Sequence, residues 1–288
     1  MAMLSEIFKK PKPILGKIQL LALPGAPDWE GQWEALITRA EQEATALATG
    51  GVDGLMIENF HDTPNASGRM DPAGAIAMTM LARRLRQFTE LPVGLSVLPN
   101  DPETALAIAI NCQADFIRLP LLTGALITQG GIVNSRLNEL LHYRNQLKAE
   151  LPPLLVNVSR AHLPFKTHFT YGNGLSDLIE VASQLPRLHE RMAIVIPDGD
   201  IQPAEVGKFK LDIGYPVLIE NLSVPQAVDA YYEHADGLVL DADTRKKSVM
   251  YPDALPTIDM SRVEVVVNRL RRVIPVSEMD PDIFLQRG

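Results

Sequence analysis

The amino-acid sequence predicts an α/β fold, a single (β/α)8 barrel of the TIM-barrel type. Short apolar segments alternate eight times with longer amphipathic segments, and this order is typical of a parallel sheet covered by helices. The length of 288 residues is close to that of one such barrel. An open, doubly wound sheet is the weaker alternative, because residues 21–25 (Leu-Ala-Leu-Pro-Gly) lack the glycine-rich first turn that it needs.

The first half of the chain carries clear start and stop signals for its helices. The helix after the first strand has apolar residues at spacings of three and four, from Trp33 to Ala48, and it ends at Gly50. The next two helices begin with an aspartate that caps the helix and a proline in its first turn, at residues 71–72 and 101–102. The first four strands are predicted at residues 14–21, 54–57, 93–97 and 116–119.

The second half of the chain keeps this alternation. Its last helix is predicted over residues 261–272 and ends in arginines, whose charge suits the negative end of the helix dipole. Because no low-complexity linker or charge block marks a boundary, we expect one domain over residues 1–288, with a core from about 14 to 274 and a tail at 275–288. The remaining strands are predicted at residues 154–158, 193–196, 217–219 and 238–240.

Composition and charge narrow the class of protein. The contents of 46% apolar and 22% charged residues are typical of a globular domain, and the net charge of −8 argues against a nucleic-acid-binding protein. No stretch approaches the ~18 apolar residues of a membrane span, and we expect no export signal. The single cysteine, Cys112, cannot form an intrachain disulfide, which fits a reducing compartment. We expect a cytoplasmic protein without a cofactor; the sequence leaves the oligomeric state open, including a homo-oligomer.

The functional face of such a barrel lies at the C-terminal ends of its strands, so polar residues there are candidates for ligand binding. Glu58 follows three apolar residues at the end of the second strand, and Arg118 lies near the end of the fourth. Inward side chains of alternate strands share a layer, so these two are expected to meet or to share a ligand. A buried ion pair without chemistry and a ligand-binding pair both remain open. The candidate ligand-binding residues are Glu58, Asn59, Asp62, Asn100, Arg118 and Asn157.

The sequence predicts no metal site and identifies no catalytic residue. His162 and His168 lie in one loop, and His61 could approach them, but no histidine pair has the helical spacing of a zinc protease. One cysteine cannot supply a thiolate cage for a metal. Cys112 lies on an apolar helix, where a lone cysteine is usually an inert small hydrophobic residue.

The loops after the seventh and eighth strands do not favour phosphate. Phosphate-binding barrels place glycines there, so that backbone N–H groups can approach the anion. Here the carboxylates of Glu220, Asp241 and Asp243 stand at these places, and we predict that sugar phosphates do not bind. The basic run at residues 245–247 is interpreted as a solvated surface turn.

Several segments together resemble the BtpA family. They are residues 51–64 (GVDGLMIENFHDTP), 97–101 (VLPND), 114–118 (ADFIR) and 122–125 (LTGA). The resemblance implies a ribulose-phosphate-binding-type barrel. For cyanobacterial members it implies a peripheral thylakoid protein that stabilises photosystem I reaction-centre polypeptides, whereas other bacterial and archaeal members are suspected enzymes.

The chain departs from the family pattern near the barrel mouth and is identified as a divergent member. Gln19 replaces the usual histidine, Pro99 replaces an arginine, and Glu220 and Asp241 stand where the family has glycines. The leading hypothesis is therefore a non-catalytic photosystem I biogenesis factor, peripheral to the cytoplasmic face of the thylakoid membrane. It would be attached through a protein partner or an apolar loop such as residues 119–126, and its expected partners are photosystem I polypeptides or assembly factors.

The alternative hypothesis is an enzyme that acts on a small polar or phosphorylated substrate. A host without photosynthesis would exclude the first hypothesis and leave this one. Its substrate contacts would come from Glu58, Asn59, Asp62, Arg118 and Asn157.

Overall fold

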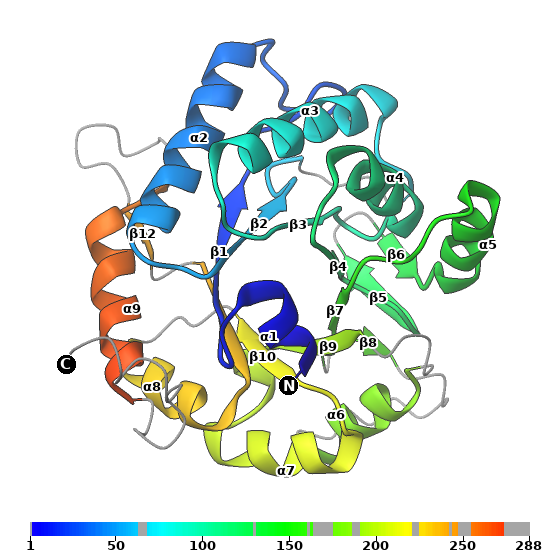
Figure 1. Cartoon of the computed structure of the whole chain (residues 1–288). Helices are drawn as coiled ribbons and strands as arrows, with labels where there is room; N and C mark the ends of the chain where they lie inside the picture. The colour runs from blue at the N-terminus through cyan, green and yellow to red at the C-terminus, as the bar shows by residue number, and fades with distance from the viewer. Residues whose placement is uncertain are drawn as a thin grey trace.

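Eight parallel strands close into a barrel at the centre of the molecule, in the order β1-β11-β10-β9-β7-β4-β3-β2. Figure 1 shows this barrel surrounded by helices. The predicted fold class is therefore confirmed. The structure, a computed structural model of the chain, describes residues 2–62, 68–128, 131–159, 162–163, 175–185, 191–220, 225–241, 244–246 and 255–273.

All eight predicted strands are confirmed, and the differences lie at their ends. The first strand stops at Gln19 rather than at residue 21, and the third stops at Ser96. The second and seventh strands extend to Glu58 and Glu220. These two side chains continue the alternation of inward and outward positions along their strands and point into the barrel. The strands are β1 (Ile14–Gln19), β2 (Gly54–Glu58), β3 (Val93–Ser96), β4 (Phe116–Leu119), β7 (Leu154–Asn157), β9 (Met192–Pro197), β10 (Val217–Glu220) and β11 (Gly237–Leu240).

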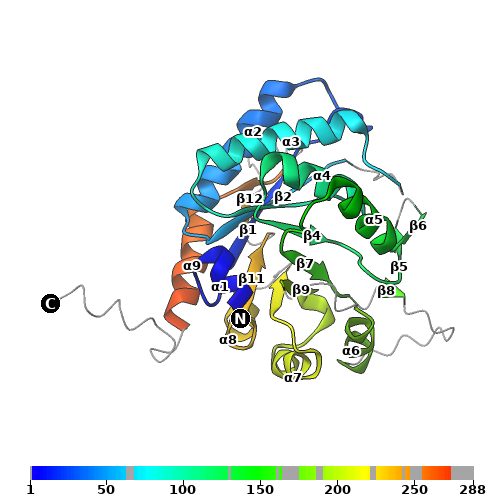
Figure 2. The same ribbon diagram turned by 45° about the vertical axis from the view of Figure 1, so that its right-hand side comes forward.

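The helices form an outer ring around the strands (Figure 2). Two of them begin as predicted: the carboxylate of Asp71 accepts a hydrogen bond from the backbone N–H of Ala73, and that of Asp101 accepts one from Thr104. Outward strand residues such as Ile18 pack in the apolar core between the sheet and the helices. The ring contains α2 (Trp33–Thr49), α3 (Pro72–Phe88), α4 (Pro102–Cys112), α5 (Leu137–Leu147), α6 (Leu175–Ser183), α7 (Pro203–Ile213), α8 (Pro225–His234) and α9 (Met260–Val273).

Inward side chains fill the barrel in two layers of different chemistry. The lower layer, nearer the N-terminal ends of the strands, is apolar, and the upper layer is polar and forms the barrel mouth. Gly94 on β3 leaves space in the lower layer, because a Cβ built there would lie 2.3 Å from the ring of Phe116 on β4. The lower layer consists of Leu15, Met56, Phe116, Leu155, Ala193, Val195, Leu218 and Val239.

A short helix, α1 (Ala2–Phe8), covers the lower layer of the barrel, as its place over the strands in Figure 1 shows. Met3, Leu4 and Phe8 are buried against the interior side chains, and the ring of Phe8 meets that of Phe116 edge-on at 5.3 Å. Helix α1 is not predicted from the sequence, because seven residues give too short a window to establish helical periodicity.

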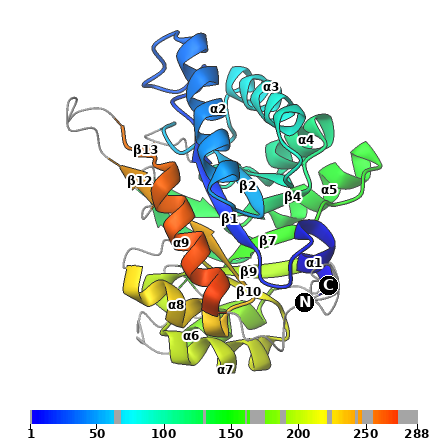
Figure 3. The same cartoon turned by 60° about the vertical axis from the view of Figure 1, so that its left-hand side comes forward.

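Two small sheets, also missed by the sequence analysis, extend from the barrel; β12 is visible beside α9 in Figure 3. Strands of two to four residues show too little alternation to be recognised. The strands β6-β5-β8 form one antiparallel sheet and β12-β13 form the other. Their bounds are β5 (Ala125–Thr128), β6 (Gly131–Asn134), β8 (His162–Leu163), β12 (Arg245–Lys246) and β13 (Thr257–Ile258), and a 3-10 turn η1 (Asp198–Asp200) follows β9.

The prediction that residues 119–126 form an apolar loop available for attachment is wrong. Leu119, Leu121 and Leu122 are each only 2% exposed, because Leu119 and Leu122 belong to the core between the sheet and the helices. The exposed apolar pair lies next to it: Ile127 and Ile132 face each other across β5 and β6, and each is 62% exposed. Within the part of the chain that the structure describes, no helix is long and apolar enough to cross a membrane.

Candidate functional site

The barrel mouth is lined by polar side chains that almost every strand contributes from its C-terminal end. They point inward because successive side chains of a strand alternate between its two faces. Seven of them, on five strands and in the position after β11, are buried, and five of the seven are held in ion pairs. These residues are Lys17 and Gln19 (β1), Glu58 (β2), Ser96 (β3), Arg118 (β4), Glu220 (β10) and Asp241 (after β11), with the partly buried Asn157 (β7) beside them.

Arg118 is at the centre of this layer and contacts two carboxylates. Its Nη1 donates to Glu58 Oε1 at 2.8 Å, and its Nη2 donates to Glu220 Oε1 at 2.6 Å and to Asn157 Oδ1 at 3.1 Å. The predicted meeting of Glu58 and Arg118 is confirmed, and Asn157 joins them. Arg118 Nε is buried and has no hydrogen-bond partner among the described residues.

Lys17 is a second buried cation of the mouth, and the sequence analysis missed it. Its Nζ lies 3.3 Å from Glu220 Oε2 and 3.4 Å from Asp241 Oδ2. Burial alone would lower the pKa of Lys17, but the carboxylates of Glu220 and Glu58 outweigh burial and raise it. Lys17 is therefore charged at neutral pH.

Glu220 is a buried carboxylate of the mouth with a lowered pKa. Burial would raise the pKa of its carboxyl, but Arg118 and Lys17 outweigh burial and lower the pKa from 4.5 to about 2. On sequence grounds this carboxylate is expected to repel phosphate. In the structure it pairs with two buried cations, Arg118 and Lys17.

Glu220 should make the protein less stable in acid. Its pKa is lower in the folded chain than in the unfolded chain, so its stabilising effect is present above pH 4.5 and is lost as the pH falls towards about 2. In urea denaturation, Glu220→Gln should be less stable than wild type at pH 7 and should decline less steeply over that window. Glu139→Gln, an exposed acid on α5, is the control, and a decline parallel to wild type in Glu220→Gln would contradict the assignment.

A second ionic network lies behind the mouth and corrects the interpretation of residues 245–247 as a solvated turn. Arg245 is buried: it donates to Glu43 of α2 at 2.8 Å and to Asp241 at 3.1 Å. Gln19 Nε2 also donates to both carboxylate oxygens of Asp241, at 3.0 and 3.1 Å. Lys246 is exposed as expected, and residue 247 lies outside the described residues.

Asn59 and Asp62 connect the loops after the first three strands. Asn59 Oδ1 accepts from the backbone N–H of Leu98 at 2.7 Å, and Asn59 Nδ2 donates to Asp62 Oδ2 at 3.0 Å. Asp62 Oδ1 accepts from the N–H of Leu23 at 2.8 Å. Burial raises the pKa of Asp62, although the hydrogen bonds from Leu23 and Asn59 act against this shift. The two side chains therefore hold three loops together.

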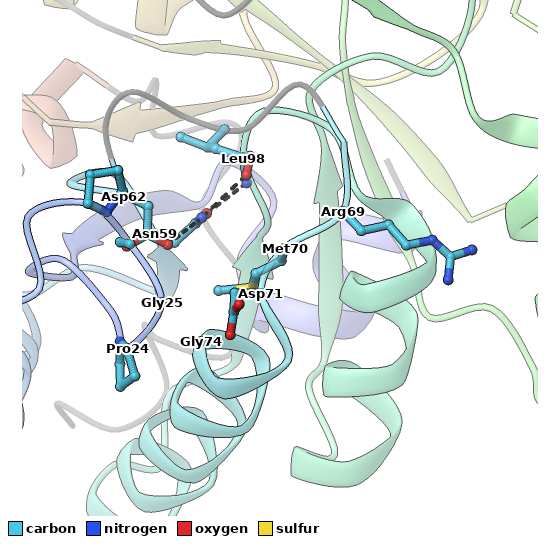
Figure 4. Close-up of a pocket in the computed structure, with 11 residues that line it drawn as sticks. Pro24, Gly25, Asn59, Asp62, Arg69, Met70, Asp71, Gly74 and Leu98 are labelled. Carbon is cyan, nitrogen blue, oxygen red and sulfur yellow. Dashed lines mark hydrogen bonds between the residues drawn. The ribbon is translucent and has the colours of Figure 1, made fainter.

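A pocket of about 290 Å³ opens beside this connection (Figure 4). Its wall includes Asn59, Asp62 and Leu98 on one side and Asp71 and Gly74 of the α3 N-terminus on the other. The polar atoms of Asn59 and Asp62 are already hydrogen-bonded to protein groups. A ligand would reach the edges of these side chains rather than replace a missing partner.

Asn100 stands apart from both groups. Its Nδ2 donates to the backbone carbonyl of Asn134 on β6 at 3.1 Å, and its buried Oδ1 has no hydrogen-bond partner among the described residues. The six predicted residues thus divide into three sets. Glu58, Arg118 and Asn157 meet in the mouth, Asn59 and Asp62 connect loops, and Asn100 anchors the β6 strand.

The structure describes only some of the residues on which the phosphate and metal predictions depend. Asp243 lies outside the described residues, as does His168. Glu220 and Asp241 are present at the ends of β10 and β11 and are paired with Lys17. In the described ranges, no three histidine, cysteine, aspartate or glutamate residues come together as a group that could hold a metal ion.

Comparison with known proteins places this barrel in a family. The family model described as "BtpA family" matches residues 10–272. The chain belongs to the BtpA family. It is 46% identical over 148 residues to the photosystem I biogenesis protein BtpA of Synechocystis, an alignment that covers 51% of this chain and only 52% of that protein. It is also 30% identical over 235 residues to an uncharacterized protein of Pyrococcus horikoshii, covering 80% of this chain and 86% of that one.

Solved structures show the same fold at low sequence identity. Dihydropteroate synthase from Anaplasma phagocytophilum aligns with a TM-score of 0.56 and 13% identity, over 92% of this chain and 100% of the synthase. This similarity supports the barrel fold and says nothing of the reaction.

Proposed function

We propose that this BtpA-family protein is a photosystem I biogenesis factor and works as a non-catalytic scaffold, peripheral to the cytoplasmic face of the thylakoid membrane. The observation that carries the proposal is the 46% identity with the Synechocystis photosystem I biogenesis protein over 148 residues. The mouth supports a scaffold, because the buried cations Arg118 and Lys17 balance the buried carboxylates of Glu58 and Glu220.

The proposed partners are photosystem I polypeptides or assembly factors, contacted through protein surface rather than through anionic lipid. The net charge of −8 disfavours attraction to a negatively charged membrane surface. The exposed pair Ile127 and Ile132 offers an apolar contact on the β5–β6 hairpin, in place of the buried loop at residues 119–126.

The proposal predicts that deleting the gene in its host lowers photosystem I selectively. The measurement is the amount of photosystem I reaction-centre polypeptides relative to those of photosystem II, with the wild-type gene restored as the control. Unchanged photosystem I in the deletion strain would overturn the proposal, and so would a host that has no photosystem I.

An enzyme acting on a small polar substrate is the second candidate. It is favoured by the open pocket beside Asn59 and Asp62. The C-terminal face, where this pocket lies, carries the active site in TIM-barrel enzymes generally.

Two measurements separate the candidates. A scaffold should restore photosystem I when the mouth charges are replaced by the neutral pair Arg118→Met and Glu58→Gln, whereas an enzyme that uses them should not. In calorimetry, a scaffold should show no binding of sugar phosphates at millimolar concentration. A clear signal for a ribulose-type phosphate would favour the enzyme.

A further inference from the structure

A second pocket, distinct from the one in Figure 4, opens on the C-terminal face beside β1 and β2. Its volume of about 550 Å³ lies within the range of small-molecule sites. The chain segment after β1, the first turn of α2 and the loop after β2 form its walls. The apolar part of the wall comes mainly from Leu21, Trp29, Leu36 and Leu255.

The indole of Trp29 is held in a fixed place on this wall. It is partly buried and packs against the apolar core, and the backbone N–H of Trp29 donates to the carbonyl of Ala26 at 3.1 Å. The ring of Trp33 meets it edge-on at 5.6 Å. A side chain positioned in this way loses little freedom when a ligand binds.

The polar part of the wall is acidic. It contains the carboxylates of Asp28 and Glu30 and the amide of Gln32, which donates to Glu30 at 3.1 Å. No lysine or arginine is among the residues found to line the pocket. Burial, together with Arg39 and Arg245, lowers the pKa of His61, so its imidazole is neutral at pH 7.

We propose that this pocket binds a small organic cation with an apolar body, such as an aromatic quaternary amine. The apolar body would rest on Leu21, Leu36 and Leu255, and the charge would face the indole of Trp29 and the carboxylates of Asp28 and Glu30. Tryptophan is the side chain that best attracts cations to a ring face. This site is independent of the ion pairs of the barrel mouth and of the proposed scaffold role.

Tryptophan fluorescence can report binding at this pocket. It has two tryptophans, of which Trp29 lines the pocket and Trp33 contacts Trp29. Titration of the full chain with benzyltrimethylammonium should therefore give a saturable change in tryptophan fluorescence, and the Trp33→Phe variant should retain it. Neutral benzyl alcohol should bind more weakly, and benzenesulfonate should not bind.

Variants distinguish the proposed site from non-specific adsorption, with affinity measured by calorimetry. Trp29→Leu should weaken binding of benzyltrimethylammonium by about 2–5-fold. The double variant Asp28→Asn, Glu30→Gln should weaken it by about 5-fold at low salt. Glu34→Gln, an exposed acid on α2 outside the pocket, should bind like wild type.

Three outcomes would overturn the proposal. They are no saturable signal with the wild-type chain, equal binding of the cation and benzyl alcohol, and an unchanged affinity in both pocket variants. Circular dichroism of each variant checks that the fold is retained, and all five substituted side chains lie at or near the surface.

Discussion

The Arg118→Met variant is expected to lose about 3–5 kcal/mol of its free energy of unfolding. The substitution removes the guanidinium that contacts Glu58 at 2.8 Å and Glu220 at 2.6 Å, and both carboxylates stay buried. Methionine keeps most of the apolar stem of arginine, so the larger part of the loss comes from unpaired charge. Urea denaturation at pH 7 measures it.

A second substitution tests which carboxylate, once Arg118 is removed, costs more stability as an unpaired buried charge. Glu220 keeps Lys17 as a partner, whereas the ion pair of Glu58 in the described residues is with Arg118. Adding Glu58→Gln to Arg118→Met should therefore recover most of the lost stability, and adding Glu220→Gln should recover less. Equal recovery by the two double variants would show that the charges act as one diffuse cluster.

The same variants also test the role of the mouth. If Arg118→Met proves as stable as wild type but no longer supports the function of the protein in its host, the structural assignment of the ion pairs is refuted. The mouth would then be the place to look for a ligand, because functional groups are often retained at a cost to stability.

Shortening Phe8 to alanine is expected to cost about 3–5 kcal/mol, the usual range for a large aromatic residue in a core. Phe8 is buried and its ring contacts that of Phe116, so the substitution opens a cavity between α1 and the lower layer of the barrel. Thermal or urea denaturation measures the loss.

Glu6→Ala is the matched control for this second prediction. Glu6 lies on the same helix but is exposed, so its removal should change stability by less than about 0.5 kcal/mol. If Phe8→Ala were as mild as Glu6→Ala, helix α1 would not be part of the cooperative fold.

The barrel could be predicted because its strands are apolar runs separated by strong helix signals. The meeting of Glu58 and Arg118 could also be predicted, since both lie on alternate strands at the same end of the barrel. Lys17 was missed although its signal was present: it is a lysine within an apolar strand, two positions before the inward-facing Gln19. A charge in that place needs a partner inside the barrel.

Other parts of the site depend on contacts that local sequence does not contain. Arg245 belongs to a basic run that looks solvated, yet its partner Glu43 is supplied by a helix from the other end of the chain. Asn59 and Asp62 were predicted as ligand contacts, but the backbone groups of Leu23 and Leu98 that they bind come from loops whose approach only the closed barrel determines.

The close fit of Gly94 and Phe116 has a consequence for the evolution of the family. A side chain on Gly94 would enter the volume of the phenyl ring, so Gly94 cannot gain one while Phe116 keeps its ring. Relatives with alanine or a larger residue at the position of Gly94 are expected to carry a smaller residue in place of Phe116. The two positions should therefore covary, and an engineered Gly94→Ala barrel should tolerate its new methyl group only together with Phe116→Leu.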